Sequence, residues 1–144
     1  MKLSISTPVD QDYISVKNGF NIGLFEKLSP PFPPVKLLRF DGSAKNDFVS
    51  MKIDFLIFSQ TWTSKIVEAK TTSEEFVFVD EGIKLPFFLK SWRHTHRVIN
   101  MQKGSLIRDE IKYTAPFGLL SIVLYPFLYL QFAYRKPVYK KIFA

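Results

Sequence analysis

The sequence predicts an α+β domain, in which a long C-terminal helix crosses the concave face of a curved, seven-stranded antiparallel sheet and two short helices follow the first strand. Three observations carry this prediction. Apolar and polar residues alternate through most of Val35–Tyr113, as in half-buried strands. Short turn sequences separate these runs, and short links join antiparallel neighbours. The segment Phe117–Tyr134 then has no charge and shows apolar residues at helical spacing.

The whole chain, 1–144, is expected to form one domain, because 144 residues are enough for one core and too few for two domains of ordinary size. Hydrophobic residues make up 47% and charged residues 23%, which excludes a disordered tail and a fibrous repeat. The aromatic share of 16% is more than packing alone needs, so a cavity lined by rings is expected. The absence of Cys excludes disulfide scaffolds, thiolate metal sites and Cys nucleophiles.

The first part of the chain predicts a strand and two short helices. Met1–Asp10 alternates apolar and polar residues and lacks the apolar stretch of a secretory signal, so we expect a strand and a cytoplasmic protein. Asp10 is expected to cap a helix that runs through Asn18, and Asn21–Leu28 predicts a second helix. The run Pro30–Pro34 forbids continuation and reads as an extended link.

The middle of the chain predicts six strands joined in a meander. The turns between them include Asp41-Gly42, Glu81-Gly82 and Lys103-Gly104. The expected strands are Val35–Phe40, Phe48–Phe58, Gln60–Lys70, Glu75–Val79, Lys90–Met101 and Ser105–Tyr113.

The uncharged segment Phe117–Tyr134 has two interpretations. It is just long enough to span a bilayer, and the basic residues from Arg135 to Lys141 would suit the cytoplasmic side. We favour an amphipathic helix packed on the sheet, because polar or helix-weakening residues interrupt the segment and an apolar stripe runs along it. The stripe consists of Leu119, Val123, Phe127, Leu130 and Tyr134.

One helix covers only part of a concave sheet, so a cavity is expected between them. Such a space is the natural place for a small apolar ligand. We expect the ligand to contact Trp62 and Trp92 on the sheet, and Val123, Phe127 and Leu130 on the helix.

Motifs in order along the chain resemble the SRPBCC superfamily, and more narrowly its bacterial ligand-binding branch, which is related to polyketide cyclases and dehydrases. The motifs are Leu28-Ser29-Pro30-Pro31, Trp62–Ile66, Trp92–His96, Ile107–Gly118 and Phe132–Arg135. The resemblance spans nearly the whole chain. It implies the helix-grip fold shared with START lipid-transfer domains, birch-pollen-allergen-like proteins and polyketide aromatase/cyclases, in which a deep cavity binds lipids, sterols or polyketides. The chain has Leu85-Pro86-Phe87-Phe88 where the family commonly has Gly-Pro-Phe, so this loop is expected to differ.

Polar residues concentrate on two neighbouring strands. Side chains alternate faces along a strand, so Trp92, His94 and His96 share a face, which their apolar neighbours mark as the inner one. By the same alternation, Asp109 and Tyr113 point inward from the next strand. A buried carboxylate needs a hydrogen-bonding partner, and a histidine on the adjacent strand is the nearest one.

The expected His-Asp pair admits two interpretations. It is a structural network in which His94, His96, Asp109 and Tyr113 orient the polar end of a ligand, or it is the acid and base of a cyclase or dehydratase, with His94, His96 and Asp109 as catalytic candidates. We expect no metal site, because two His and one Asp give at most three ligands. No cofactor is expected, and no phosphate loop or nucleophile elbow occurs.

The preferred function is binding or carrying a small hydrophobic molecule, lipid-like or polyketide-like, with the enzyme as an alternative. The net charge of +7 is scattered along the chain, so no nucleic-acid partner is expected. A further alternative is a membrane-associated accessory domain. Aromatic and basic residues alternate near the C-terminal end, which suits contact with an anionic bilayer surface. The sequence leaves the oligomeric state open.

Overall fold

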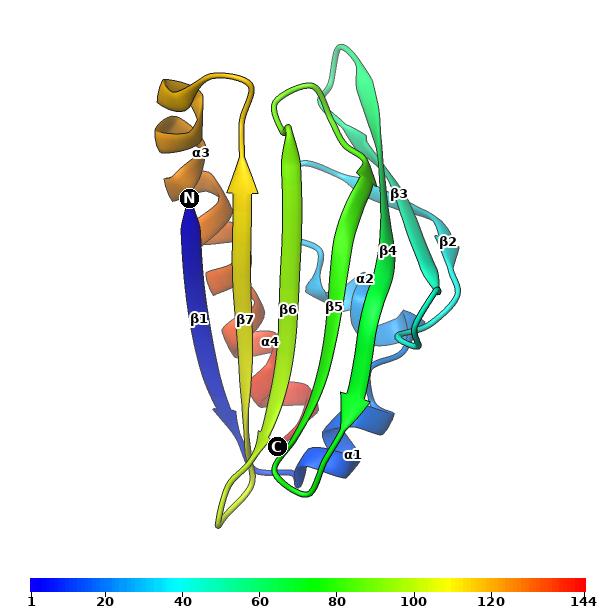
Figure 1. Ribbon diagram of the computed structural model, residues 1–144, viewed down its shortest axis with the longest axis vertical. Helices are drawn as coiled ribbons and strands as arrows, with labels where there is room; N and C mark the ends of the chain where they lie inside the picture. Colours follow the sequence, from blue (N-terminus) through cyan, green and yellow to red (C-terminus); the bar gives the residue numbers. More distant parts are fainter.

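A sheet and a layer of helices make up the computed structural model, which describes residues 1–144 (Figure 1). The seven strands form one antiparallel sheet in the order β1-β7-β6-β5-β4-β3-β2, and the predicted fold class is confirmed. The strands are β1 (Lys2–Val9), β2 (Val35–Phe40), β3 (Phe48–Asp54), β4 (Ser59–Thr71), β5 (Glu75–Lys84), β6 (Ser91–Asn100) and β7 (Ser105–Thr114). The helices are α1 (Tyr13–Asn18), α2 (Ile22–Leu28), α3 (Gly118–Ala133) and α4 (Arg135–Ile142).

The two short helices begin at side-chain caps. Asp12, and not the expected Asp10, caps α1 by accepting hydrogen bonds from the backbone N–H groups of Ile14 and Ser15. Asp10 follows directly on the paired strand β1, where its N–H donates to the carbonyl of Phe143 at 3.1 Å. Asn21 caps α2 in the same way as Asp12 caps α1.

One strand boundary matters for the site. The sequence predicted a strand that ends at Val79 and a turn at Glu81-Gly82, but β5 continues to Lys84. Gly82 instead pairs with Ser64 of β4, next to an irregularity in the register. In a strand every second side chain lies on the same face of the sheet. Because β5 continues past Val79, Asp80 lies on the same face as Phe76 and Phe78 and points toward the helices.

The C-terminal helix is longer than expected and bends at Tyr134, between α3 and α4. Pro137 explains the bend, because it has no N–H to donate to the carbonyl of Ala133. None of the helices combines the length and the apolar character needed to cross a bilayer.

The apolar stripe predicted to face the sheet faces outward. Leu119, Val123, Phe127, Leu130 and Tyr134 are 73%, 50%, 65%, 65% and 38% exposed, so this prediction is wrong. The buried side of α3 carries Ser121, Leu128 and Phe132 instead. Both sides of this helix are apolar, so the spacing of apolar residues could not tell which one packs on the sheet.

The buried side chains form two apolar clusters with a polar band between them. One cluster gathers around α1, α2 and α4, and the other around the inner side of α3. On β6, Trp92 belongs to the second cluster and Val98 to the first, with His94 and His96 between them. On β7, Asp109 lies in the same way between Ile107 and Ile111.

The helices cover the sheet unevenly. In Figure 1, α3 and α4 lie behind the β1 and β7 edge, and α1 packs against β5, β6 and β7. Neither of the C-terminal helices packs extensively on β2, β3 or β4. This half of the sheet faces α2, and the space left there is the cavity described next.

Candidate functional site

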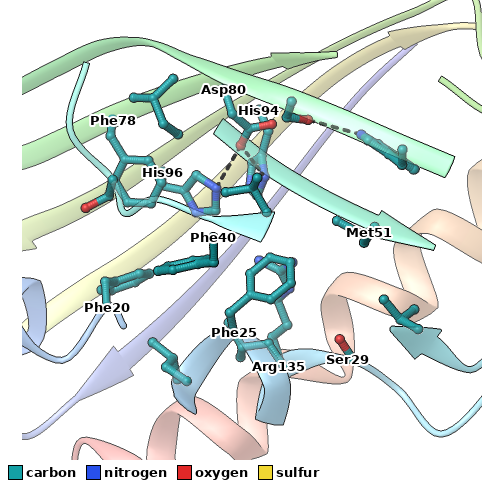
Figure 2. Close-up of a pocket in the computed structure, with 18 of the residues that line it drawn as sticks. Phe20, Phe25, Ser29, Phe40, Met51, Phe78, Asp80, His94, His96 and Arg135 are labelled. Carbon is teal, nitrogen blue, oxygen red and sulfur yellow. Dashed lines mark hydrogen bonds and ion pairs between the residues drawn. The ribbon is translucent and has the colours of Figure 1, made fainter. Parts of the chain in front are cut away.

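A cavity of about 160 Å³ lies between the β2–β6 part of the sheet, α2 and the bend of the C-terminal helix (Figure 2). Its lining is mostly apolar and includes the rings of Phe20, Phe25, Phe40 and Phe78. The charged and ionisable residues of the lining are Asp80, His94 and His96 on one wall and Arg135 at the bend. Its neutral polar residues are spread more widely, at Asn21, Ser29, Ser43, Ser64 and Gln131. The cavity is partly open to the surface.

Four predicted site residues meet at this cavity: Trp62, Trp92, His94 and His96. The two indole rings contact edge to face, with centroids 4.7 Å apart and an angle of 87°. The indole N–H of Trp62 donates to Ser64 at 3.1 Å, and that of Trp92 donates to Asp80 at 3.2 Å. Both indole N–H groups are therefore satisfied within the protein.

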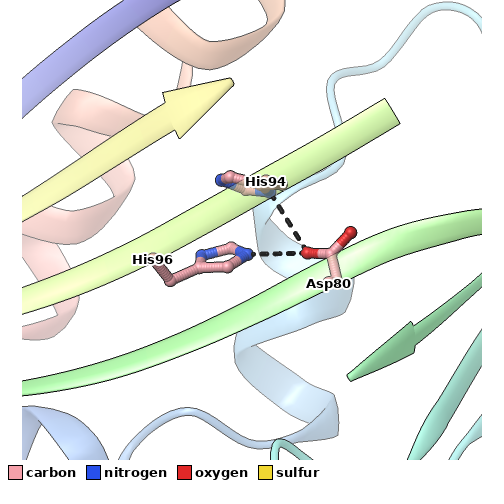
Figure 3. Close-up of side chains that lie close together, drawn as sticks. All are labelled: Asp80, His94 and His96. Atoms are coloured by element: carbon pink, nitrogen blue, oxygen red, sulfur yellow. Dashed lines mark hydrogen bonds and ion pairs between the residues drawn. The ribbon is translucent and has the colours of Figure 1, made fainter. Parts of the chain in front are cut away.

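Asp80 joins the two histidines on the cavity side (Figure 3). Nε2 of His96 donates to Oδ2 of Asp80 at 3.2 Å, and Nδ1 of His94 lies 3.4 Å from the same oxygen. The imidazole rings lie against each other with centroids 3.5 Å apart, and the ring of Phe78 stacks on His96 at 4.1 Å. Both histidines are thus fixed in orientation.

Asp109 joins the same histidines from behind. Nε2 of His94 donates to Oδ1 of Asp109 at 2.8 Å, and Nδ1 of His96 lies 3.2 Å from that oxygen without hydrogen-bond geometry. Tyr139 of α4 donates to the other oxygen at 3.4 Å, and Nη1 of Arg135 lies 3.6 Å from Oδ1. The predicted His-Asp pair therefore exists, and the C-terminal helix takes part in it.

The carboxylates of this cluster are ionised. Burial alone would raise the pKa of Asp80 and of Asp109. The contacts with His94 and His96 outweigh it and hold both pKa values well below the ordinary range. The positive charge of Arg135 adds to the effect at Asp109.

The two carboxylates favour the protonated form of His94. Burial would lower its pKa, but the hydrogen bonds and charges of Asp109 and Asp80 raise it above the ordinary value. The buried cluster thus sets two carboxylates against the Arg135 guanidinium and an imidazole at His94 whose protonated form they favour. In chemical terms, a molecule in the cavity would meet an imidazole of fixed orientation at His94, which can act as an acid when protonated. It would also meet a hydrogen-bond donor at Arg135.

The cluster also has the composition of a metal site. Asp80, His94 and His96 each offer one ligand atom, and these atoms lie within 4.8 Å of one another. In the structure these atoms are hydrogen-bonded or ion-paired with one another.

Five predicted contact residues lie outside the cavity lining. Asp109 is buried behind the histidines and supports them. Tyr113 is also buried, but its hydroxyl donates to the carbonyl of Ser121 at 2.7 Å and fastens the first turn of α3 to β7. Val123, Phe127 and Leu130 lie on the exposed side of α3, so the expectation that they line the cavity is wrong for the reason given above.

Sequence reasoning missed Asp80 and Arg135. A signal for Asp80 was present, because it continues the period-two pattern of Phe76 and Phe78 once the strand is extended. For Arg135 the only signal was its position directly after the apolar segment. A basic residue at that position is equally compatible with exposure to solvent.

Solved structures with the same fold include an enzyme. No family model and no curated protein matches the sequence. The truncated norcoclaurine synthase of Thalictrum flavum is 12% identical, with 92% of this chain and 88% of that chain covered and a TM-score of 0.65. The same enzyme in complex with dopamine and hydroxybenzaldehyde is 13% identical, with 96% and 86% covered and a TM-score of 0.62.

Two further solved structures agree. Protein Ms6760 from Mycobacterium smegmatis is 14% identical over 92% of this chain and 84% of that one, with a TM-score of 0.64. The ginseng major latex-like protein 151 from Panax ginseng is 14% identical over 92% of both chains, with a TM-score of 0.62. The chain therefore shares the helix-grip fold of these proteins, as its motifs implied. At these identities the likeness extends to the fold alone.

Proposed function

We propose that the protein binds a small, mainly apolar molecule in the cavity, with a polar end directed at the histidine wall and Arg135. The observation that carries this proposal is a mostly apolar cavity in which the charged and ionisable groups are confined to the histidine wall and to Arg135 at the bend. Nη1 of Arg135 is buried and has no hydrogen-bond partner, although the residue lines the cavity. A ligand oxygen beside the part of the guanidinium that lines the cavity would accept a charge-assisted hydrogen bond.

The size of the cavity limits the ligand. A dry apolar cavity of about 150 Å³ holds a molecule the size of benzene. At about 160 Å³, this cavity accommodates one ring, and a longer lipid-like or polyketide-like chain would extend through the opening. The norcoclaurine synthase complex with dopamine and hydroxybenzaldehyde supports ligands of one ring for this fold.

The binding free energy would come mainly from apolar burial, at roughly 25 cal/mol per Å² removed from water. Polar contacts to Arg135 and the histidines would fix the orientation. This division of roles is usual for small-molecule sites, in which few polar groups line a mostly apolar pocket.

The two tryptophans of the chain make the test direct, since both line the cavity. Titration of the protein with hydroxybenzaldehyde should shift the indole N–H signals of Trp62 and Trp92 in NMR spectra. The variant Met51→Trp, which places a large ring in the cavity, should abolish the shifts. Lys52→Trp is the matched control, because Lys52 is the exposed neighbour of Met51 on β3.

Native mass spectrometry of the freshly purified protein adds an independent test, because an apolar molecule that co-purifies would identify the ligand class. The proposal fails if a panel of one-ring and acyl-chain compounds leaves both indole signals unchanged.

A second candidate function is a cyclase or dehydratase. The observation in its favour is the His94 imidazole, which borders the cavity between Asp80 and Asp109, two carboxylates that favour its protonated form. An acid so placed would protonate a carbonyl or a leaving hydroxyl of a bound molecule. Replacing His94, His96 or Asp109 singly while measuring both binding and turnover separates the two functions, because a binding protein shows no turnover to lose.

A further inference from the structure

The outer side of α3 exposes an unusually large number of apolar side chains. Eight residues near or on this helix are between 38% and 73% exposed: Phe117, Leu119, Ile122, Val123, Phe127, Tyr129, Leu130 and Tyr134. No charged residue occurs from Ala115 to Tyr134. Isolated exposed apolar residues are ordinary, but a contiguous apolar surface of this kind marks a contact site.

The apolar side of α3 continues into a basic side of α4. At 100° per residue, Lys140 and Lys141 project near the direction of Ile122, Phe127 and Leu130. Both lysines are exposed. Arg135, in contrast, points into the core beside Asp109 and does not belong to this surface. One side of the bent helix therefore presents an apolar stretch followed by positive charge.

Further apolar side chains are exposed at the end of the sheet where α3 begins. The β3–β4 and β5–β6 connections lie at this end (Figure 1). Leu56 and Ile57 in the first are 79% and 91% exposed, and Phe87 in the second is 63% exposed. Three separate segments of the chain thus expose large apolar side chains at one end of the molecule.

We propose that this surface docks on an anionic lipid bilayer, with the side of α3 lying in the headgroup region and Lys140 and Lys141 contacting lipid phosphates. An anionic bilayer has negatively charged headgroups at its surface and apolar acyl chains beneath them. A helix with an apolar side and neighbouring lysines can contact both layers. A second copy of the chain is the main rival occupant. Each copy carries a net charge of +7, which opposes self-association and favours an anionic partner.

The test is flotation of the full chain with vesicles of phosphatidylcholine alone and of phosphatidylcholine mixed with phosphatidylglycerol. The wild-type protein should float with the mixed vesicles, and less with the neutral ones. The double variant Phe127→Ser/Leu130→Ser should reduce the bound fraction roughly tenfold. Its control is Leu38→Ser/Ile83→Ser, which removes two residues that are 51% and 58% exposed on the strands β2 and β5.

A second pair of variants tests the charges. Lys140→Glu/Lys141→Glu should remove the preference for phosphatidylglycerol, whereas Lys45→Glu/Lys103→Glu, with the same charge change at two exposed turn residues, should keep it. Thermal unfolding of each variant verifies that the fold is intact. The proposal is overturned if the wild type floats with neither vesicle, or if Phe127→Ser/Leu130→Ser floats as well as the wild type. A wild-type dimer that becomes a monomer in Phe127→Ser/Leu130→Ser, with no flotation of either, would assign the surface to a second copy instead.

Discussion

Asp109 holds His94 from the side opposite the cavity: Nε2 of the imidazole donates to Oδ1 of the carboxylate at 2.8 Å, and the Asp109 side chain is only 2% exposed. The two residues are brought together by β6 and β7, although they are not direct register partners. His96 pairs with Asp109, and His94 pairs with Ile111. The carboxylate thus serves both histidines from one position.

Asp109→Asn should destabilise the protein strongly. The substitution leaves the His94 imidazolium and Arg135 with one fewer buried counter-charge, and breaking a buried ion pair from one side costs about 3–5 kcal/mol. Urea unfolding measures the loss. Asp10→Asn, at an exposed carboxylate, should change the free energy of unfolding by less than about 0.5 kcal/mol. Equal effects of the two variants would contradict the assigned role of Asp109.

The cluster also predicts how stability depends on pH. The pKa of His94 is raised in the folded protein, so its contribution is complete below the unfolded value of about 6.5 and is lost as the pH rises through the folded value. The pKa values of Asp80 and Asp109 are lowered, so their contributions are complete above about 3.9 and are lost as the pH falls below it. Urea unfolding between pH 3 and 9 should show a maximum between these limits.

NMR titration of His94 provides the direct check, with an imidazole pKa above the ordinary range. In His94→Gln the decline of stability on the alkaline side should disappear, whereas the decline on the acid side should remain. A wild-type protein whose free energy of unfolding increases from pH 6.5 to pH 8 would rule out the charged state assigned to His94.

Tyr113→Phe should loosen the start of α3. The hydroxyl of Tyr113 donates to the carbonyl of Ser121, and the hydroxyl of Ser121 accepts from the N–H of Ala115 at 3.0 Å. Loss of the first bond removes one buried hydrogen bond and should cost about 0.5–1.5 kcal/mol. Hydrogen exchange should become faster in the first turns of α3. Tyr129→Phe, at a residue 46% exposed, is the control and should leave the exchange unchanged.

Two glycines should respond to alanine in opposite ways. Gly104, in the β6–β7 turn, has a φ of +68°, and an added Cβ would lie 2.1 Å from the carbonyl oxygen of Val9. Gly104→Ala should therefore lower the melting temperature. Gly118 is the first residue of α3, and an added Cβ there would meet nothing within 4 Å. Gly118→Ala should leave the melting temperature unchanged or raise it.

The alternation of residues was enough to predict the fold and the inward direction of His94, His96 and Asp109. Strand periodicity has two outcomes only, and the apolar neighbours Trp92 and Val98 decide between them. The same logic did not work for α3. A helix that is apolar on both sides gives no contrast, so sequence alone could not choose between the stripe of Leu119 and Phe127 and the side of Leu128 and Phe132.

The site was only half predictable for a different reason. Asp80 and Arg135 enter it through tertiary placement: β5 runs past a dipeptide that normally marks a turn, and the helix continues beyond Tyr134 so that its next residue points inward. Local preferences describe short segments, whereas a buried charge is placed by partners distant along the chain. Asp109 and Arg135 are partners of this kind, and only the folded chain brings them together.

The uneven cover of the sheet has a consequence for motion. The C-terminal helices do not pack extensively on the strands β2 and β3, whereas Tyr139 of α4 is hydrogen-bonded to Asp109. We therefore expect an outward movement of β2 and β3 to cost less free energy than a movement of α4 away from the sheet. We expect a ligand to enter and leave the cavity through movement of β2 and β3, while the two apolar clusters stay packed.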